Sequence, residues 1–164
     1  MLDVIKLKEE FIAISNKLEK KLEEVPEDKF FIRPEENKWS VGEVAEHLFK
    51  VDTPVVAILQ GKKSDIPSDK PERKKIIIER AFSDPDKKFT ANGPIVPQDD
   101  FDSKVLLIRA IKQIREQISH LIDKVDLTYV CLEFKHPLLG EMTGAEWIHF
   151  INLHTERHIK QLKY

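Results

Sequence analysis

The sequence has one cysteine, five glycines and no long apolar run, and these scarcities exclude several classes of protein. Cys131 can form neither a disulfide within the chain nor a CxxC zinc site, because no second cysteine is present. No stretch approaches the roughly 18 consecutive apolar residues that a membrane-spanning helix needs. The first residues, MLDVIKLKEEF, carry acids and lysines among their apolar side chains, which is not the pattern of a signal peptide. A cytoplasmic protein with no membrane partner is therefore expected.

Neither sign of charge dominates the chain. Lys and Arg total 27 and Asp and Glu total 29, which gives a formal net charge of −2. Because no net positive field is available to hold a polyanion, a strongly basic nucleic-acid-binding protein is excluded. With 164 residues, 41% of them hydrophobic and 34% charged, the chain has the size and composition of a single domain spanning residues 1–164.

Apolar residues recur at alternating spacings of three and four along four stretches, which is the pattern of amphipathic helices. The first helix is expected over residues 4–25, and Pro26 ends it. The second is expected to open at Ser40 and Glu43, whose spacing is that of a reciprocal capping box.

The second helix is expected to end at Gly61 and contains a proline. Pro54 removes a backbone donor, so it must either kink this helix or restart it with Thr53 as a cap. The third helix is expected to begin near Asp102 or Ser103 and to continue through residue 125.

The last helix is expected to begin with a second capping box, formed by Thr143 and Glu146, and to run almost to Tyr164. A loop is expected before it, over residues 134–140.

Five of the nine prolines fall within residues 62–101, which therefore form a long crossover between the second and third helices. A short extra helix is expected within it, over residues 72–82. The fold class is all-α, a bundle of four long helices.

Three of the six histidines are expected to point into the bundle. His154 and His158 are four residues apart, so they lie about one turn apart on one face of the last helix, within about 60° of Trp147. His47 shares a face of the second helix with Val44. Three imidazoles directed into one core are costly unless they are partnered, and a metal ion is an effective partner.

Each of these histidines also has a purely structural interpretation. A single inward histidine is more often a hydrogen-bonded core residue than a ligand, and an HxxxH spacing alone is a weak metal signal. The segment from His154 to His158 is not a zincin motif, because Thr155 stands where that motif has its glutamate.

The other candidate groups are expected to be structural. His120 falls opposite the apolar face of its helix and is interpreted as a surface residue, whereas His149 is interpreted as peripheral. His136 precedes a proline in the expected loop and is assigned a structural role. Cys131 is interpreted as a small buried side chain rather than a nucleophile, because no local base accompanies it.

Two segments resemble a known family. Residues 38–48, KWSVGEVAEHL, look like the opening of the second helix in the DinB/YfiT-like superfamily. Residues 136–147, HPLLGEMTGAEW, followed by His154, His158 and Gln161, resemble the start and body of that family's last helix.

The resemblance implies a four-helix bundle in up-down-down-up order and a homodimer. It also implies one divalent metal ion, zinc or nickel, held by His47, His154 and His158, the same residues that the helix faces select. Some members of the superfamily are thiol S-transferases that use a low-molecular-weight thiol such as bacillithiol, mycothiol or glutathione, whereas others are described as metal-dependent hydrolases or stress-induced proteins.

The hypothesis is therefore a metal-dependent enzyme that acts on a small-molecule substrate. It would transfer a low-molecular-weight thiol to an electrophile or hydrolyse a small substrate, with an open coordination position at the three-histidine site. The alternative is a non-catalytic metal- or ligand-binding bundle of the stress response, since no further acid, base or nucleophile can be named from the sequence.

Overall fold

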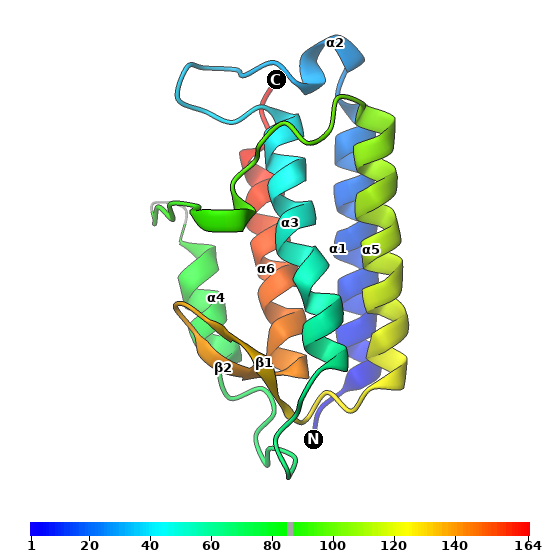
Figure 1. Ribbon diagram of the computed structural model, residues 1–164, viewed down its shortest axis with the longest axis vertical. Coiled ribbons are helices and arrows are strands. Elements are labelled where there is room, and N and C mark those ends of the chain that lie inside the picture. Colours follow the sequence, from blue (N-terminus) through cyan, green and yellow to red (C-terminus); the bar gives the residue numbers. More distant parts are fainter. Residues whose placement is uncertain (85–86) are drawn as a thin grey trace.

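The predicted apolar stripes form four long helices whose buried faces meet in a common core (Figure 1). The computed structural model describes residues 1–84 and 87–164. The long helices are α1 (Val4–Glu24), α3 (Val41–Gln60), α5 (Lys104–Lys124) and α6 (Gly144–Gln161). In Figure 1, α1 and α6 run upward and α3 and α5 run downward, which confirms the up-down-down-up order.

Short elements connect the long helices. They are α2 (Glu27–Phe30), α4 (Lys75–Ser83), the 3-10 turn η1 (Gly93–Ile95), and the strands β1 (Val130–His136) and β2 (Gly140–Thr143). The expected extra helix is thus present as α4, although it begins three residues later than predicted.

Both predicted capping boxes are present. At the start of α3 the Ser40 hydroxyl accepts from the Glu43 amide at 3.1 Å, and the Glu43 carboxylate accepts from the Ser40 amide at 2.8 Å. Thr143 and Glu146 make the same pair of bonds at the start of α6. Each box pairs two backbone donors that a helix start would otherwise leave unsatisfied, so it fixes where the helix begins.

Two details of the predicted secondary structure are wrong. The expected loop over residues 134–140 belongs to an antiparallel hairpin of β1 and β2, in which Val130 pairs with Thr143. Alternating apolar residues at 130, 132 and 134 carry this strand pattern. The restart at Thr53 is also wrong, because α3 is continuous through Pro54 and the Thr53 hydroxyl donates to the Phe49 carbonyl at 2.7 Å.

A buried ion pair joins all four long helices. Arg115 on α5 donates through Nε to Asp52 on α3 at 2.9 Å, and through its Nη atoms to Ser15 on α1 and Thr155 on α6. The Asp52 and Arg115 side chains are 1% and 4% exposed. Burial raises the pKa of Asp52, and the neighbouring Arg115 guanidinium opposes that rise. The pair therefore acts as a polar cross-link inside an apolar core.

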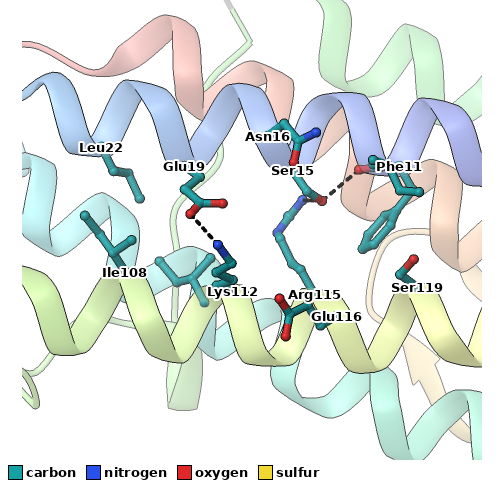
Figure 2. Close-up of a pocket in the computed structure, with 12 residues that line it drawn as sticks. Phe11, Ser15, Asn16, Glu19, Leu22, Ile108, Lys112, Arg115, Glu116 and Ser119 are labelled. Atoms are coloured by element: carbon teal, nitrogen blue, oxygen red, sulfur yellow. Dashed lines mark hydrogen bonds and ion pairs between the residues drawn. The ribbon is translucent and has the colours of Figure 1, made fainter.

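The cross-link borders a groove between α1 and α5. Figure 2 shows Arg115 extending from α5 toward Ser15 on α1 within this groove, which has a volume of about 150 Å³. Lys112 and Glu19 form an ion pair across it at 2.9 Å. None of the three inward histidines lines the groove.

Over the described residues, none of the helices combines the length and apolar character needed to cross a membrane.

We expect Arg115→Met to destabilise the fold by about 3–5 kcal/mol, because it leaves the Asp52 carboxylate buried without a counter-charge. The double variant Arg115→Met/Asp52→Leu should recover most of that loss, since both charges are then removed from the core. Urea unfolding followed by circular dichroism measures both. A double variant no more stable than Arg115→Met would show that the ion pair itself, and not the unpaired charge, determines the loss.

Candidate metal centre

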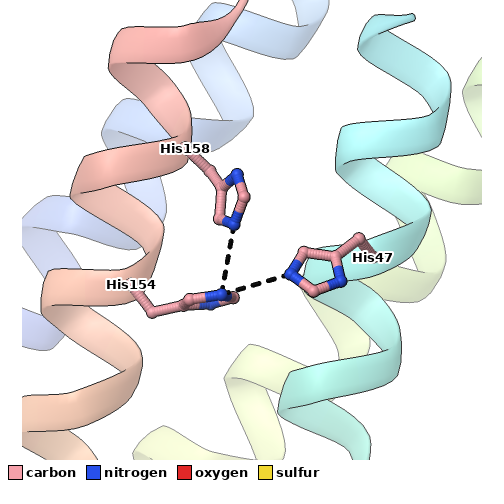
Figure 3. Close-up of side chains that lie close together, drawn as sticks. All are labelled: His47, His154 and His158. Atoms are coloured by element: carbon pink, nitrogen blue, oxygen red, sulfur yellow. Dashed lines mark hydrogen bonds between the residues drawn. The ribbon is translucent and has the colours of Figure 1, made fainter. Parts of the chain in front are cut away.

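The structure brings together the three histidines that the helix faces selected. His47 on α3 faces His154 and His158 on α6, and all three rings point at one another (Figure 3). His154 Nε2 lies 3.2 Å from His47 Nε2 and 3.1 Å from His158 Nε2. One nitrogen from each ring lies within 4.8 Å of the other two.

The helices explain this convergence. His154 and His158 are separated by one helical turn, so their side chains lie one above the other on the face of α6 that packs against α3. His47 comes from the first half of α3, which runs antiparallel to α6 (Figure 1). His47 and His154 are buried, and His158 alone of the three is partly exposed.

Hydrogen bonding cannot account for all three contacts. His47 Nδ1 lies 2.8 Å from the Ile95 carbonyl oxygen, which only accepts, so Nδ1 carries the proton and Nε2 of the neutral ring has a lone pair. His154 Nε2 then faces both this lone pair and His158 Nε2. If His154 Nε2 carries the proton, that one hydrogen faces two nitrogens. If it does not, its lone pair meets the lone pair of His47 Nε2.

The donor set fits a metal ion. Two imidazole nitrogens bound to one tetrahedral zinc ion at about 2.0–2.1 Å lie about 3.3 Å apart, close to the two separations in the cluster. Nδ1 of His154 and Nδ1 of His158 are buried and make no hydrogen bond to any described residue. Three neutral imidazoles suit zinc and nickel, among other transition metals.

Comparison with known proteins agrees with the fold. The sequence model of the DinB superfamily matches residues 10–162. The chain belongs to the DinB superfamily. It is 29% identical over 142 residues to the uncharacterized protein YuaE of Bacillus subtilis (strain 168), which covers 87% of this chain and 86% of YuaE. The crystal structure of TT2238, a four-helix bundle protein, matches with a TM-score of 0.63 at 16% identity over 96% of both chains.

The environment of the histidine cluster keeps the imidazoles neutral. Burial, together with repulsion from the nearby His47, lowers the pKa of His158 to about 3. Burial also lowers the pKa of His154 well below its ordinary value, with added repulsion from His158 and His47. The pKa of His47 is lowered by burial against the opposing effect of the Ile95 carbonyl. Neutral rings are the form that binds metals.

Aromatic side chains surround the cluster. The Phe150 ring stacks on His154 with centroids 5.5 Å apart, and Phe82 meets His154 edge-on at 5.9 Å. Trp39 lies 5.2 Å from the His47 ring. These rings exclude water from the sides of the cluster and restrict how its imidazoles rotate.

The remaining histidines lie outside the cluster, as expected. His120 is exposed, and His136 accepts from the backbone amides of the turn that follows it. His149 was expected to be peripheral, and it is buried, with Nε2 2.7 Å from Glu72. Cys131 is fully buried, and burial raises the pKa of its thiol.

One contributor to the site has no sequence signal. The Ile95 carbonyl that fixes the His47 tautomer belongs to the crossover and is a backbone atom, so no residue type marks it. Glu46 and Lys50, which hold this part of the crossover, are one turn apart on α3, and that spacing could have indicated only a surface ion pair.

Acid should destabilise the metal-free protein below about pH 6.5, where histidines of the unfolded chain take up protons. In the folded protein the His158 pKa is about 3, so the unfolded state binds more protons over this window and the free energy of unfolding falls as the pH falls. Each such histidine contributes a slope of about 1.4 kcal/mol per pH unit.

Urea unfolding at several pH values, with a chelator present, measures the slope. His158→Gln should reduce this slope by about 1.4 kcal/mol per pH unit, the contribution of one histidine. An equal slope in wild type and His158→Gln would show that the pKa of His158 is not depressed.

Proposed function

We propose that this chain is a metal-dependent enzyme in which His47, His154 and His158 hold one divalent metal ion, zinc or nickel. The observation that carries the proposal is the convergence of three buried imidazole nitrogens with no tautomer that satisfies them all. Membership in the DinB superfamily supports it. Three protein donors leave a coordination position for a non-protein ligand, which is how catalytic rather than structural sites are built.

The proposed reaction transfers a low-molecular-weight thiol to an electrophile or hydrolyses a small substrate. A bound divalent metal would act as a Lewis acid and lower the pKa of a coordinated thiol or water toward neutrality. The chain's own residues hold the rings neutral, fix the His47 tautomer through Ile95 and exclude water with Phe82 and Phe150. The partly exposed His158 marks the side from which a small molecule would approach.

A second candidate is a metal-binding bundle without catalytic activity. The acids that flank the site on α3 favour it, because both are already engaged. Glu46 accepts from two backbone amides and pairs with Lys50, and Asp52 pairs with Arg115. Neither carboxylate is free to transfer protons to a substrate, so turnover would depend on the metal and its histidines alone.

We expect one divalent metal ion per chain by elemental analysis after mild purification. His47→Ala and the double variant His154→Ala/His158→Ala should lose the ion, whereas His120→Ala, which changes an exposed histidine, should keep it. The metal should also raise the melting temperature, since a ligand present at 100 times its Kd stabilises a fold by about 2.7 kcal/mol. Retention by His47→Ala together with loss in His120→Ala would contradict the site.

Turnover should separate the two candidates. The metal-loaded protein is incubated with each of several low-molecular-weight thiols and a generic halide electrophile, and loss of free thiol is followed with time. We expect at least one thiol to react faster with wild type than with His154→Ala/His158→Ala, which serves as the matched background. Equal rates for all thiols and for a panel of small esters and amides, with one metal ion still bound per wild-type chain, would favour the non-catalytic bundle.

A further inference from the structure

The crossover residues 93–100, called the strap below, are fastened to α3 beside the histidine cluster. The strap begins with η1, which lies beside α3 in Figure 1 and contacts it. Its Ile95 carbonyl accepts from His47, and its Val96 carbonyl accepts from Lys50 Nζ at 3.1 Å. The strap therefore reaches the metal centre through a backbone atom, whose position depends on how the strap is held.

Glu46 makes the most extensive contact with the strap. Its carboxylate is 3% exposed and accepts from the Gln98 amide at 2.7 Å and from the Asp100 amide at 3.3 Å. Lys50 Nζ lies 2.8 Å from the same carboxylate and 2.8 Å from the Asp100 carboxylate. A buried carboxylate with an ammonium and two amides is well satisfied, which is the condition for a charge to be retained inside a fold.

The strap needs this fastening because its backbone is strained. Asp99 has a φ of 58°, in the left-handed region that residues with a β-carbon rarely adopt. The two amides that Glu46 accepts from are those immediately before and after Asp99. Glu46 thus holds the backbone on both sides of the strained residue and stabilises the turn that follows Ile95.

His47 depends on this contact more than the other two rings depend on any polar partner. Among the described residues, neither His154 Nδ1 nor His158 Nδ1 has a hydrogen bond, whereas His47 Nδ1 has the Ile95 carbonyl. Aromatic packing orients His154, but packing does not select a tautomer. The bond to Ile95 does select one, because it keeps the proton on Nδ1 and the lone pair on Nε2.

We propose that Glu46 is a positioning residue of the metal centre, acting through the strap to fix the orientation and tautomer of His47. The inference rests on the proposed metal site. Glu46 is not one of the three proposed ligands; it holds the backbone segment whose Ile95 carbonyl holds His47. Supporting contacts of this kind typically change metal affinity by about 10- to 100-fold.

The test compares Glu46→Gln with wild type in two measurements. The variant keeps the size of the side chain, but its amide places a donor against a backbone N–H or the Lys50 ammonium, so the strap should detach. We expect the Kd for zinc, measured by competition with a chromogenic chelator, to rise about 10- to 100-fold. In the metal-free protein, nitrogen-15 spectra of the histidine rings should show His47 as the Nδ1–H tautomer in wild type and as a mixture in Glu46→Gln.

Two further variants keep the test decisive. Glu43→Gln removes a carboxylate three residues earlier on α3 together with its ion pair to Arg33, so it should lower stability slightly without changing the zinc Kd or the His47 tautomer. Lys50→Met removes the second side chain that holds the strap, so it should change the zinc Kd and the His47 tautomer in the same direction as Glu46→Gln. This variant provides the test if Glu46→Gln does not fold.

Wild-type zinc affinity and an unchanged His47 tautomer in folded Glu46→Gln and Lys50→Met would overturn the proposal. An equal effect from Glu43→Gln would also overturn it, because the effect would then follow from helix stability. Failure of wild type to bind either zinc or nickel would instead refute the proposed function. The tautomer measurement, made without metal, would still report whether Glu46 holds His47.

Discussion

The convergence of three imidazoles between α3 and α6 is the constraint on which the rest of this structure depends. An unpaired buried polar group costs about 1–3 kcal/mol, and two nitrogens of the cluster, His154 Nδ1 and His158 Nδ1, have no hydrogen-bond partner among the described residues. A core under selection for stability alone would place apolar side chains at 47, 154 and 158. The fold instead keeps the rings together and neutral, which is the state that a metal ion stabilises.

The buried Asp52–Arg115 ion pair helps to hold together the two helices that carry the histidines. Asp52 follows His47 on α3, Thr155 directly follows His154 on α6, and Arg115 bonds to both Asp52 and Thr155. The two helices that carry the histidines are therefore joined a short distance away by a polar contact that tolerates little sliding. The Arg115 charge also contributes to the low pKa of His154. Removing a polar cross-link of this kind would loosen the separation between α3 and α6 that sets the spacing of the rings.

Side-chain periodicity predicts much of this structure from the sequence, whereas the contacts made by backbone atoms could not be predicted. The positions of His47, His154 and His158 on apolar helix faces predicted the cluster, and the two capping boxes predicted where α3 and α6 begin. The hairpin was missed because a short alternating run competes with loop signals from a proline and a glycine. The Ile95 carbonyl has no sequence signature, since every residue has such an oxygen and only the path of the crossover places it at the site.

The topology explains why that path exists. Because α3 and α5 run in the same direction, the connection between them must return along the whole bundle, and a helix of 20 residues such as α3 is about 30 Å long. A chain that covers this distance passes the first half of α3, where His47 lies and where η1 supplies the Ile95 carbonyl. Tight hairpins between antiparallel neighbours would leave that side of His47 open to water. In this bundle the long connection supplies the carbonyl that orients His47, and the buried Glu46 and Lys50 keep it in place.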